Sequence, residues 1–428
     1  MGIPEIAAVL GLLFAAGVFL AQYQHRDRAM AVLVGISAGL VGVQVLRVHV
    51  FTILVLLWCV MPSGHLNRGS GKRITALVVT SGLLAVTALY GDLVTSPTLA
   101  LQLLGLTASA CMIIAKGTER DRKDMLYGLL AVVTVSSSLG MLQVAKIVPI
   151  EIWHVHVSSV GRPIGLYSEP DWLGLFAGLG LILAWRLPLP AGLRTFCISV
   201  NAAAFVFAFA RAAWIAVGAA VALIIVTSLF RRKAKEEAKS KVRGKWPAVL
   251  LVVAAGLAFL VGNPLFAEDF IRRLQGTFSV GSHDISGQAR VRQIDRLWKM
   301  ANAAPWNGDG LSANGRVGIW GSYNSGDAAD TVNAVSSNWL LALWVDGKLM
   351  ALPFIILLIA LAVLTCRTIA GQLLVVVLLN SLFSNATFQP ITWLLVALAF
   401  SAAWDRTDAP AVEPQIKQLR DRAKHPAY

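Results

Sequence analysis

The sequence predicts an all-α fold, a polytopic integral membrane helical bundle of about 12–13 transmembrane helices. The first reason is composition: 57% of the 428 residues are hydrophobic and 14% are charged, whereas soluble domains average about 45–50% and about 25%. The second reason is that the apolar residues form blocks, such as 74–90 and 350–365, close to the roughly 17–25 residues that cross a bilayer core. Most blocks lack the polar face of a helix in a soluble protein, so a lipid bilayer is the expected surrounding.

The charge distribution is the third reason. The formal net charge is +14, and the basic residues lie between the apolar blocks. The segment 231–245 is the densest, with eight Lys or Arg residues against Glu236 and Glu237. The positive-inside rule explains this pattern better than nucleic-acid binding does, and it assigns these connections to the cytoplasm. We therefore expect a bacterial plasma (inner) membrane protein, with the N-terminus outside, the C-terminus inside and no nucleic-acid partner.

The apolar blocks place the helices in chain order. No basic stretch precedes the first block, so it is expected to be a retained helix rather than a cleaved signal peptide. The second and third blocks are short and are separated by Arg47 and His49, so they form either two crossings or a broken hairpin. The predicted helices are 3–21, 30–46, 49–62, 74–91, 98–114, 126–143, 172–185, 194–209, 212–230, 247–266, 349–365, 370–383 and 390–404.

Two long connections fall on the side opposite the basic residues. The longer one is charge-balanced and rich in Gly, Asn, Ser and Trp, which is typical of a folded or ligand-facing loop rather than of a linker. The expected divisions are N-terminal transmembrane helices 1–143, a first extracytoplasmic loop 144–171, central transmembrane helices 172–266, a large extracytoplasmic loop 267–348, C-terminal transmembrane helices 349–404 and a cytoplasmic tail 405–428.

Several kinds of site are not indicated by the sequence. The four cysteines lie in or beside apolar blocks and make no CxxC pair, so neither a zinc site nor a disulfide framework is predicted. The sequence contains no Gly-rich phosphate loop, no Walker motif and no HExxH, so ATP-driven transport and metalloprotease chemistry lack support.

Three charged residues lie where the first outer loop meets a predicted helix. Arg162 is followed by Glu169 and Asp171, immediately before the helix 172–185. Both carboxylates also suit a simple helix start, because the N-terminal end of a helix favours negative charge and capping acceptors. One guanidinium and two carboxylates at a helix mouth are therefore either a cap or part of a site.

Two further arginines are candidates for anion binding. Arg211 lies between two apolar helices at their outer end, against the positive-inside bias. A charge in such a costly place is usually functional, although a boundary arginine can also simply snorkel. Arg290 stands at the start of 287–300, where apolar residues recur at helical spacing. The alternatives for this amphipathic helix are a solvated basic face and an anion clamp, for which the planar guanidinium fork is well suited.

Together these segments resemble the bacterial O-antigen ligase and O-antigen polymerase superfamily. Its members show Arg-x-x-Gly before a helix that starts with Pro, an outer Arg between two helices, and an Arg and a Trp before a Pro-x-x-Gly-x-Gly turn. A His-Asn pair follows, and then an acidic residue and Gly. The matching residues here are Arg162, Gly165, Pro170, Arg211, Arg290, Trp298, Pro305, Gly308, Gly310, Asn338, Asp346 and Gly347. The chain departs at Ser337, where ligases of the family carry a histidine thought to assist acceptor activation. This departure favours a polymerase or a divergent glycan transferase over a ligase.

The resemblance implies a metal-independent membrane glycosyltransferase of polysaccharide biosynthesis in the cell envelope, with its active site outside the cytoplasm and no cofactor. The donor would be a glycan linked to polyprenyl pyrophosphate, and the acceptor a saccharide or a cell-surface anchor. Fixed cations would stabilise the pyrophosphate leaving group. The alternatives are an inactive scaffold and a secondary transporter or lipid-linked glycan flippase, although transporters usually show inverted repeats that are not apparent in this sequence.

These considerations give each candidate a role. A base near the acceptor hydroxyl would contribute roughly 10²–10⁴-fold, and Glu169 is the first choice, although a neighbouring arginine is expected to lower its pKa. His154 and His156 share a face of an extended segment, where hydrogen bonding at the membrane interface is the simpler interpretation. The predicted catalytic residues are Glu169, Arg211 and Arg290, and the predicted substrate-binding residues are Arg162, Asp171, His154, His156, Asn338 and Asp346.

Overall fold

The described part of the protein is mostly helical. The computed structural model describes residues 26–41, 43–45, 47–61, 67, 69–91, 93, 95–149, 162–232, 285–318, 322–323 and 335–407. These residues contain thirteen α-helices, two short 3₁₀ helices and one two-stranded sheet. The all-α prediction is therefore confirmed. The predicted helices 3–21 and 247–266 lie outside the described residues, as do most of 231–245 and the tail from residue 408.

Most predicted helices within the described residues are present, with ends that differ by a few residues. The amphipathic helix predicted at 287–300 is also present, whereas the helix at 339–347 was not predicted. In chain order the helices are α2 (Arg26–Ala38), α3 (Val50–Val60), α4 (Gly71–Val86), η2 (Thr87–Leu89), α5 (Thr95–Lys116), α6 (Glu119–Val144), α7 (Pro170–Arg186), α8 (Ala191–Phe207), α9 (Arg211–Arg232), α12 (Ile285–Ala303), η5 (Ala313–Arg316), α13 (Trp339–Gly347), α14 (Leu352–Thr365), α15 (Ile369–Asn380) and α16 (Pro390–Thr407).

The region between α2 and α3 is a broken hairpin, one of the two predicted forms. The predicted helix 30–46 already ends at Ala38, and the antiparallel strands β1 (Gln44–Val45) and β2 (Val48–His49) follow. Arg47, in the turn between them, has a φ of 68°. The prediction missed the strands because a short apolar run does not distinguish a helix from a strand.

Among the residues that the structure describes, three helical segments are long and apolar enough to cross a membrane, by length and composition. They are Gly71–Leu89, Thr95–Lys116 and Glu119–Val144. Further apolar helical stretches of 10–17 residues occur within the described part of the chain. These are Val50–Val60, Ala191–Phe207, Arg211–Leu223, Leu352–Thr365, Ile369–Asn380 and Pro390–Ala403.

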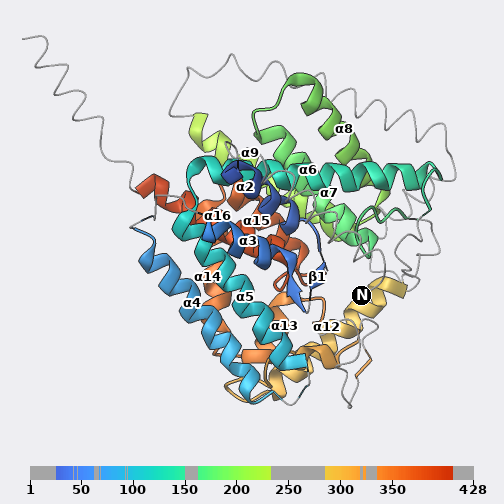
Figure 1. The fold of residues 1–428 in the computed structure, drawn as a ribbon. Coiled ribbons are helices and arrows are strands. Elements are labelled where there is room, and N and C mark those ends of the chain that lie inside the picture. The colour runs from blue at the N-terminus through green and yellow to red at the C-terminus, as the bar shows by residue number, and fades with distance from the viewer. Residues whose placement is uncertain are drawn as a thin grey trace, which may run out of the picture.

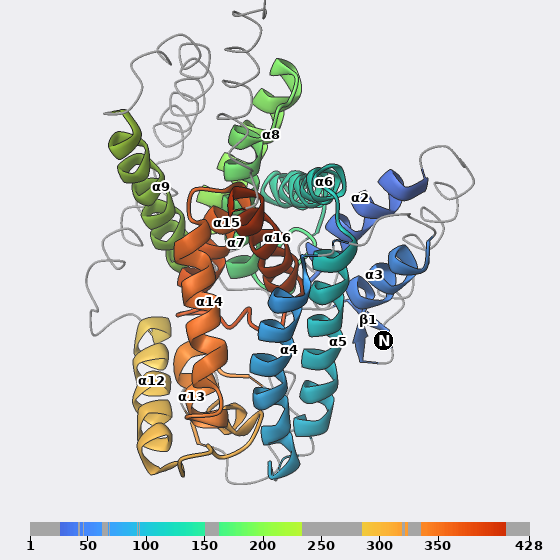
Figure 2. The ribbon, with the colours of Figure 1, turned by 90° about the vertical axis from the view of Figure 1, so that its left-hand side faces the viewer.

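Helix α6 runs crosswise to α4, α5 and α14 near the middle of the molecule, as the two views show (Figure 1 and Figure 2). It begins with a capping box, in which Thr118 and Asp121 each accept a hydrogen bond from the other's backbone N–H. An ion pair of 3.0 Å between Arg28 and Asp124 ties α2 to it. Helices α8 and α9 extend to one side of α6, while α12 and α13 lie on the other (Figure 2).

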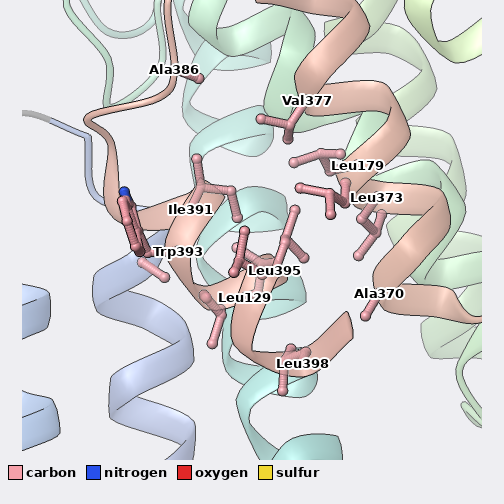
Figure 3. Close-up of a cluster of buried hydrophobic side chains, with 14 of the residues drawn as sticks. Leu129, Leu179, Ala370, Leu373, Val377, Ala386, Ile391, Trp393, Leu395 and Leu398 are labelled. Atoms are coloured by element: carbon pink, nitrogen blue, oxygen red, sulfur yellow. The ribbon is translucent and has the colours of Figure 1, made fainter. Parts of the chain in front are cut away.

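The core lies where α15 and α16 pack against α6 and α7. Leu129 of α6 and Leu179 of α7 point toward Leu373 of α15 and Leu395 of α16 (Figure 3), and all four side chains are fully buried. Burying a leucine contributes about 1.5–3 kcal/mol where it is removed from water. This core holds the start of α7, and therefore the residues that precede it, in a fixed position.

Candidate functional site

Three predicted residues from distant parts of the chain meet at the start of α7. Arg162 Nη2 donates to Asp171 Oδ1 at 2.7 Å, and Arg290 Nη2 donates to Asp171 Oδ2 at 2.9 Å. The side chains of Arg162, Asp171 and Arg290 retain 14%, 28% and 31% of their exposure, so the group reaches the surface. We call these three residues the arginine cluster. One carboxylate thus bridges two guanidiniums that lie 128 positions apart in sequence (290 minus 162).

The loop that carries Arg162 is fixed to α6 by backbone hydrogen bonds. The Oε1 atom of buried Gln143 accepts from the N–H of Ile164 at 3.0 Å and from that of Gly165 at 2.9 Å. Ser136 Oγ accepts from the N–H of Leu166 at 3.0 Å. Gly165 has a φ of 59°, and a Cβ there would lie 2.5 Å from the carbonyl oxygen of Ser136. The glycine of the Arg-x-x-Gly motif is therefore required by backbone geometry and close packing.

Arg162 also connects the cluster to the turn before α9. Its Nε donates to the carbonyl oxygen of Ala208 at 2.7 Å. Arg211, which starts α9 and is half-buried, follows three residues later. Gly174, one turn into α7, lies so close to this turn that a Cβ on it would be 2.3 Å from the Cβ of Ala210. The start of α9 is therefore packed directly against the first turns of α7.

The two carboxylates of this region have pKa values shifted in opposite directions. Burial alone would raise the pKa of Asp171, but the charges and hydrogen bonds of Arg162 and Arg290 outweigh it and lower the pKa. For Glu169, partial burial and the charge of Asp171 raise the pKa, and the two arginines offset this only in part. The pKa of Glu169 is therefore raised, whereas the sequence analysis expected an arginine to lower it. The difference arises because Asp171, and not Glu169, is bound by both guanidiniums.

Asp346 forms a second centre, which is fully buried. Its carboxylate accepts from the N–H of Ser312 at 3.1 Å, from the N–H of Asn314 at 2.9 Å and from Asn314 Nδ2 at 2.7 Å. Asn314 Oδ1 in turn accepts from the N–H of Ser336 at 2.6 Å. Despite these donors, burial raises the pKa of Asp346 to about 7. We call Asp346, Ser312 and Asn314 the aspartate hub.

The Pro-x-x-Gly-x-Gly turn lies directly against the end of α13. Gly308 and Gly310 have φ values of 84° and 94°. A Cβ on Gly308 would lie 2.4 Å from the carbonyl oxygen of Asp346, and one on Gly310 would lie 2.4 Å from Cα of Gly91. Both glycines are therefore required by positive φ and by close backbone contact. Asn338 caps the other end of α13, because its side chain accepts from the N–H of Leu341 at 3.1 Å.

Ser337, immediately before this cap, contacts α12. Its Oγ donates to Gln293 Oε1, and Gln293 Nε2 donates to the carbonyl oxygen of Gly318 at 3.2 Å. Gln293 is buried, with 3% exposure. It lies one helical turn beyond Arg290, and side chains at this spacing share a face of the helix. Gln293 therefore lies on the same side of α12 as Arg290.

A protein-family model described as O-antigen ligase matches residues 195–347, a region that contains Arg211, Arg290, Asn338 and Asp346. Over these residues the chain is similar to the O-antigen ligase family. The resemblance predicted from the motifs is thus confirmed. No curated protein matches the chain. Within this O-antigen ligase-like protein, Arg162, Glu169 and Asp171 lie before the matched region, and the ion pair of Arg290 with Asp171 joins the two parts.

The structure groups only some of the predicted site residues. Arg162, Asp171 and Arg290 are in direct contact, with Glu169 and Arg211 at the neighbouring helix starts. Asp346 lies in the aspartate hub and Asn338 at a helix cap, both within the protein scaffold. His154 and His156 lie outside the described residues. The catalytic and substrate-binding roles of all these residues stay predictions.

Sequence reasoning missed Gln143 and Gln293, which hold the two sides of the site. Each is a single amide in or beside an apolar stretch and belongs to none of the motifs. The available signal was burial, because a glutamine on the inner face of a helix needs hydrogen-bond partners. Within the described residues, no three His, Cys, Asp or Glu side chains lie close enough together to hold a metal ion.

An apolar groove of about 530 Å³ lies away from the cluster, between α6 and α8. Tyr127, Val135, Leu142, Leu193 and Phe196 are among its lining residues. No residue of the arginine cluster lines it. Its walls are almost entirely apolar, which suits a hydrocarbon chain and not a charged group.

Proposed function

We propose that this O-antigen ligase-like protein transfers a glycan from polyprenyl pyrophosphate to a sugar hydroxyl, at the outer face of a bacterial plasma membrane. The observation that carries the proposal is the arginine cluster, in which Arg162 and Arg290 are brought together by Asp171 at a surface-reaching position. The family match favours a glycan transferase over the transporter or flippase alternative.

The cluster has the charge that a pyrophosphate requires. Two guanidiniums against one carboxylate leave one excess positive charge in the arginine cluster. Arg211 at the start of α9 adds another, which Glu169 offsets when its carboxylate is ionised. Guanidiniums bind phosphate oxygens through paired, parallel N–H donors. Arg162 and Arg290 are partly exposed, so an incoming pyrophosphate can share them with Asp171.

In this proposal Asp171 is a positioning residue. It fixes the separation of Arg162 and Arg290 before the donor binds, because each of its carboxylate oxygens engages one of them. Groups fixed in advance lose less conformational freedom on binding than flexible ones do. They also lower the barrier more effectively when charge develops on the leaving group.

The reaction is a substitution at the anomeric carbon of the donor sugar. The acceptor oxygen forms a bond to that carbon, and the bond from the carbon to the pyrophosphate oxygen breaks. The electron pair leaves with the polyprenyl pyrophosphate, whose added negative charge Arg162, Arg211 and Arg290 stabilise. The acceptor hydroxyl loses its proton to Glu169. The raised pKa of Glu169 makes it a stronger base than an ordinary carboxylate.

Deletion of the gene, followed by analysis of the surface glycan, tests the proposal. Loss of glycan chain length indicates a polymerase, and loss of attachment to the cell surface indicates a ligase. An unchanged glycan would rule out both activities.

Complementation of the deletion strain then tests the cluster itself. Arg211→Ala and Arg290→Ala should each fail to restore the glycan while the protein inserts normally. The matched control is Arg296→Ala, an exposed arginine on the outer face of the same helix as Arg290, which should restore it. Full restoration of the surface glycan by Arg290→Ala would show that the arginine cluster is not required for transfer.

A further inference from the structure

Helix α12 carries exposed apolar side chains that the proposed reaction does not use. Val291, Ile294 and Trp298 keep 52%, 38% and 57% of their exposure. They recur at positions i, i+3 and i+7, which lie on one side of a helix, and we call them the apolar row. The neighbouring side of α12 is buried and consists of Ala289, Gln293, Leu297 and Ala301. Trp298 is thus a motif residue whose ring lies largely outside the core.

The basic side chains of α12 point away from the apolar row. Arg292, Arg296 and Lys299 are exposed, and Lys299 pairs with Asp295 at 2.8 Å. Residues two positions apart are separated by about 200° around a helix, so Arg296 lies nearly opposite Trp298. Apolar residues on one side and basic residues on another are typical of a helix that lies at a membrane surface.

The segment that follows α12 is fixed to the connection between α4 and α5. Tyr90 Oη donates to the carbonyl oxygen of Asn307 at 2.7 Å, and Ser96 Oγ donates to that of Leu311 at 2.5 Å. Helices α4 and α5 belong to segments that are long and apolar enough to cross a membrane, and their connection, 90–94, contains no Lys or Arg. In Figure 1, α12 slopes across the direction of α4 and α5, toward this connection. Helix α12 therefore adjoins the level at which these two segments would leave a bilayer.

Two tryptophans suit this level. Trp298 lies in the apolar row, and Trp306, just after α12, keeps 65% of its exposure. The carbonyl oxygen of Trp306 accepts from the N–H of Leu349 at 3.2 Å, three residues before the start of α14. Tryptophan is enriched where hydrocarbon meets water, because its ring is apolar and its N–H is polar. Lysine and arginine near such a ring can reach the lipid phosphates.

We infer that α12 is an interfacial helix, whose apolar row inserts into the phospholipid surface on the side of the membrane where α4 and α5 are connected. Arg290 borders this row, since it lies four residues before Ile294, which lies four residues before Trp298. Insertion therefore sets the depth of Arg290, which reaches Asp171 of the arginine cluster. Arg290 is held at the level of the lipid phosphates, where the pyrophosphate of a membrane-embedded donor would lie. This last step rests on the proposed function.

The first experiment measures the depth of the apolar row. The full-length chain, with its four native cysteines replaced by serine, carries a nitroxide label at Ile294→Cys or Trp298→Cys in phospholipid nanodiscs. Either label should collide mainly with oxygen, which dissolves among acyl chains. A label at the matched control, Arg296→Cys, should collide mainly with a water-soluble nickel chelate. Equal nickel accessibility at all three positions would overturn the inference. Low accessibility to both reagents at 294 and 298 would indicate a protein partner, such as a second copy, and would also overturn it.

The second experiment uses the native cysteines and separates depth from folding. Trp298→Ser makes the row more polar, whereas Trp298→Leu keeps it apolar. Transfer from membrane-embedded lipid-linked glycan, extracted from the deletion strain, should fall about tenfold in Trp298→Ser, because small misplacements of reacting groups are costly. It should stay near the wild-type rate in Trp298→Leu. Wild-type transfer by Trp298→Ser would contradict the role of the row in setting the depth of Arg290.

Binding of farnesyl pyrophosphate, a short polyprenyl pyrophosphate added from water, supplies the control. It should stay within twofold of the wild type in both variants, because the depth of the site does not limit a ligand that arrives from water. Loss of this binding in Trp298→Ser would show that the tryptophan only supports the fold of the site. Failure of the proposed function is distinguishable, because the wild type would then transfer no glycan while the nitroxide labels still report the position of α12.

Discussion

The two motif carboxylates, Asp171 and Asp346, are held in contrasting ways. Asp171 keeps 28% of its side-chain exposure and is bound by two guanidiniums, whereas Asp346 is fully buried and is bound by three neutral N–H groups. An incoming anion can compete with Asp171 for its two guanidiniums, because they carry charge and reach the surface. The second cannot, because every donor around it belongs to the folded backbone or to Asn314. The motif residues of this chain therefore include a buried scaffold position as well as a carboxylate in a surface-reaching ion-pair cluster.

The pKa values express the same difference. Arg162 and Arg290 overcome the burial of Asp171 and lower its pKa, so it stays charged at neutral pH. Neutral donors do not overcome the burial of Asp346, and its pKa rises to about 7. Guanidiniums stabilise a carboxylate through their full charge, whereas amide N–H groups offer only partial charges. The contrast predicts which substitutions impair folding and which impair transfer.

The largest effect is expected at the aspartate hub. Asp346→Ala leaves the N–H groups of Ser312 and Asn314 and the amide of Asn314 without an acceptor. Each orphaned buried donor costs about 1–3 kcal/mol, so the total is comparable with the whole stability of many proteins. The variant should fail to accumulate in the membrane, as measured by immunoblot. A well-folded Asp346→Ala protein would contradict the scaffold role.

The pH dependence of stability tests the same carboxylate without removing it. Its pKa rises from 3.8 in the unfolded chain to about 7 in the folded one, so the folded state binds more protons between these values. This contribution to stability is therefore present below about pH 4 and is lost as the pH rises to about 7. Thermal unfolding in detergent should show a lower Tm at pH 8 than at pH 5. Asp346→Asn should flatten the dependence, and an equal slope in both proteins would exclude Asp346 as its source.

An intermediate effect is expected at Asp171. Asp171→Asn replaces one acceptor oxygen by an NH₂ group that faces a guanidinium, so Arg162 and Arg290 lose their common partner. Transfer should fall about 10–100-fold, because the arginines are no longer held in position. Farnesyl pyrophosphate should bind at least as tightly, because a competing negative charge is gone. Weaker binding together with lower transfer would make Asp171 a direct ligand of the substrate.

Substitution of Glu169 should lower the transfer rate most at high pH, where its carboxylate is ionised. If it accepts the acceptor proton, the transfer rate should fall as the pH drops through its raised pKa. Glu169→Gln should slow transfer by about 10²-fold and abolish this acidic limb. An unaltered acidic limb in the variant would assign the proton to another group, and the arginines would then account for most of the acceleration.

The smallest effect is expected at Asn338. Its side chain caps α13 through the N–H of Leu341, and replacing an asparagine cap by alanine costs about 1 kcal/mol. Asn338→Ala should lower the Tm slightly and leave transfer per folded molecule nearly unchanged. A large loss of transfer without a loss of stability would indicate that Asn338 contacts the substrate and does not only cap α13.

The helices could be predicted because they coincide with long apolar blocks, and α12 could be predicted from its periodic apolar residues. Helix α13 was missed, because its nine residues are almost all apolar and show no helical period. The sequence placed Arg162 and Asp171 together but gave no sign that Arg290 joins them across 119 positions. Packing between distant helices decides such a contact, as it decides the partners of Gln143 and Gln293.

The ion pair of Arg290 with Asp171 has a consequence for protein engineering. It crosses the start of the matched region, since Arg290 lies within residues 195–347 and Asp171 precedes them. A chimera that moved only the matched region into a relative would carry Arg290 without its own carboxylate, and without the loop that Gln143 holds. The smallest exchangeable unit therefore includes the last turns of α6, with Ser136 and Gln143. Attempts to swap glycan specificity between relatives should cut the chain before Ser136.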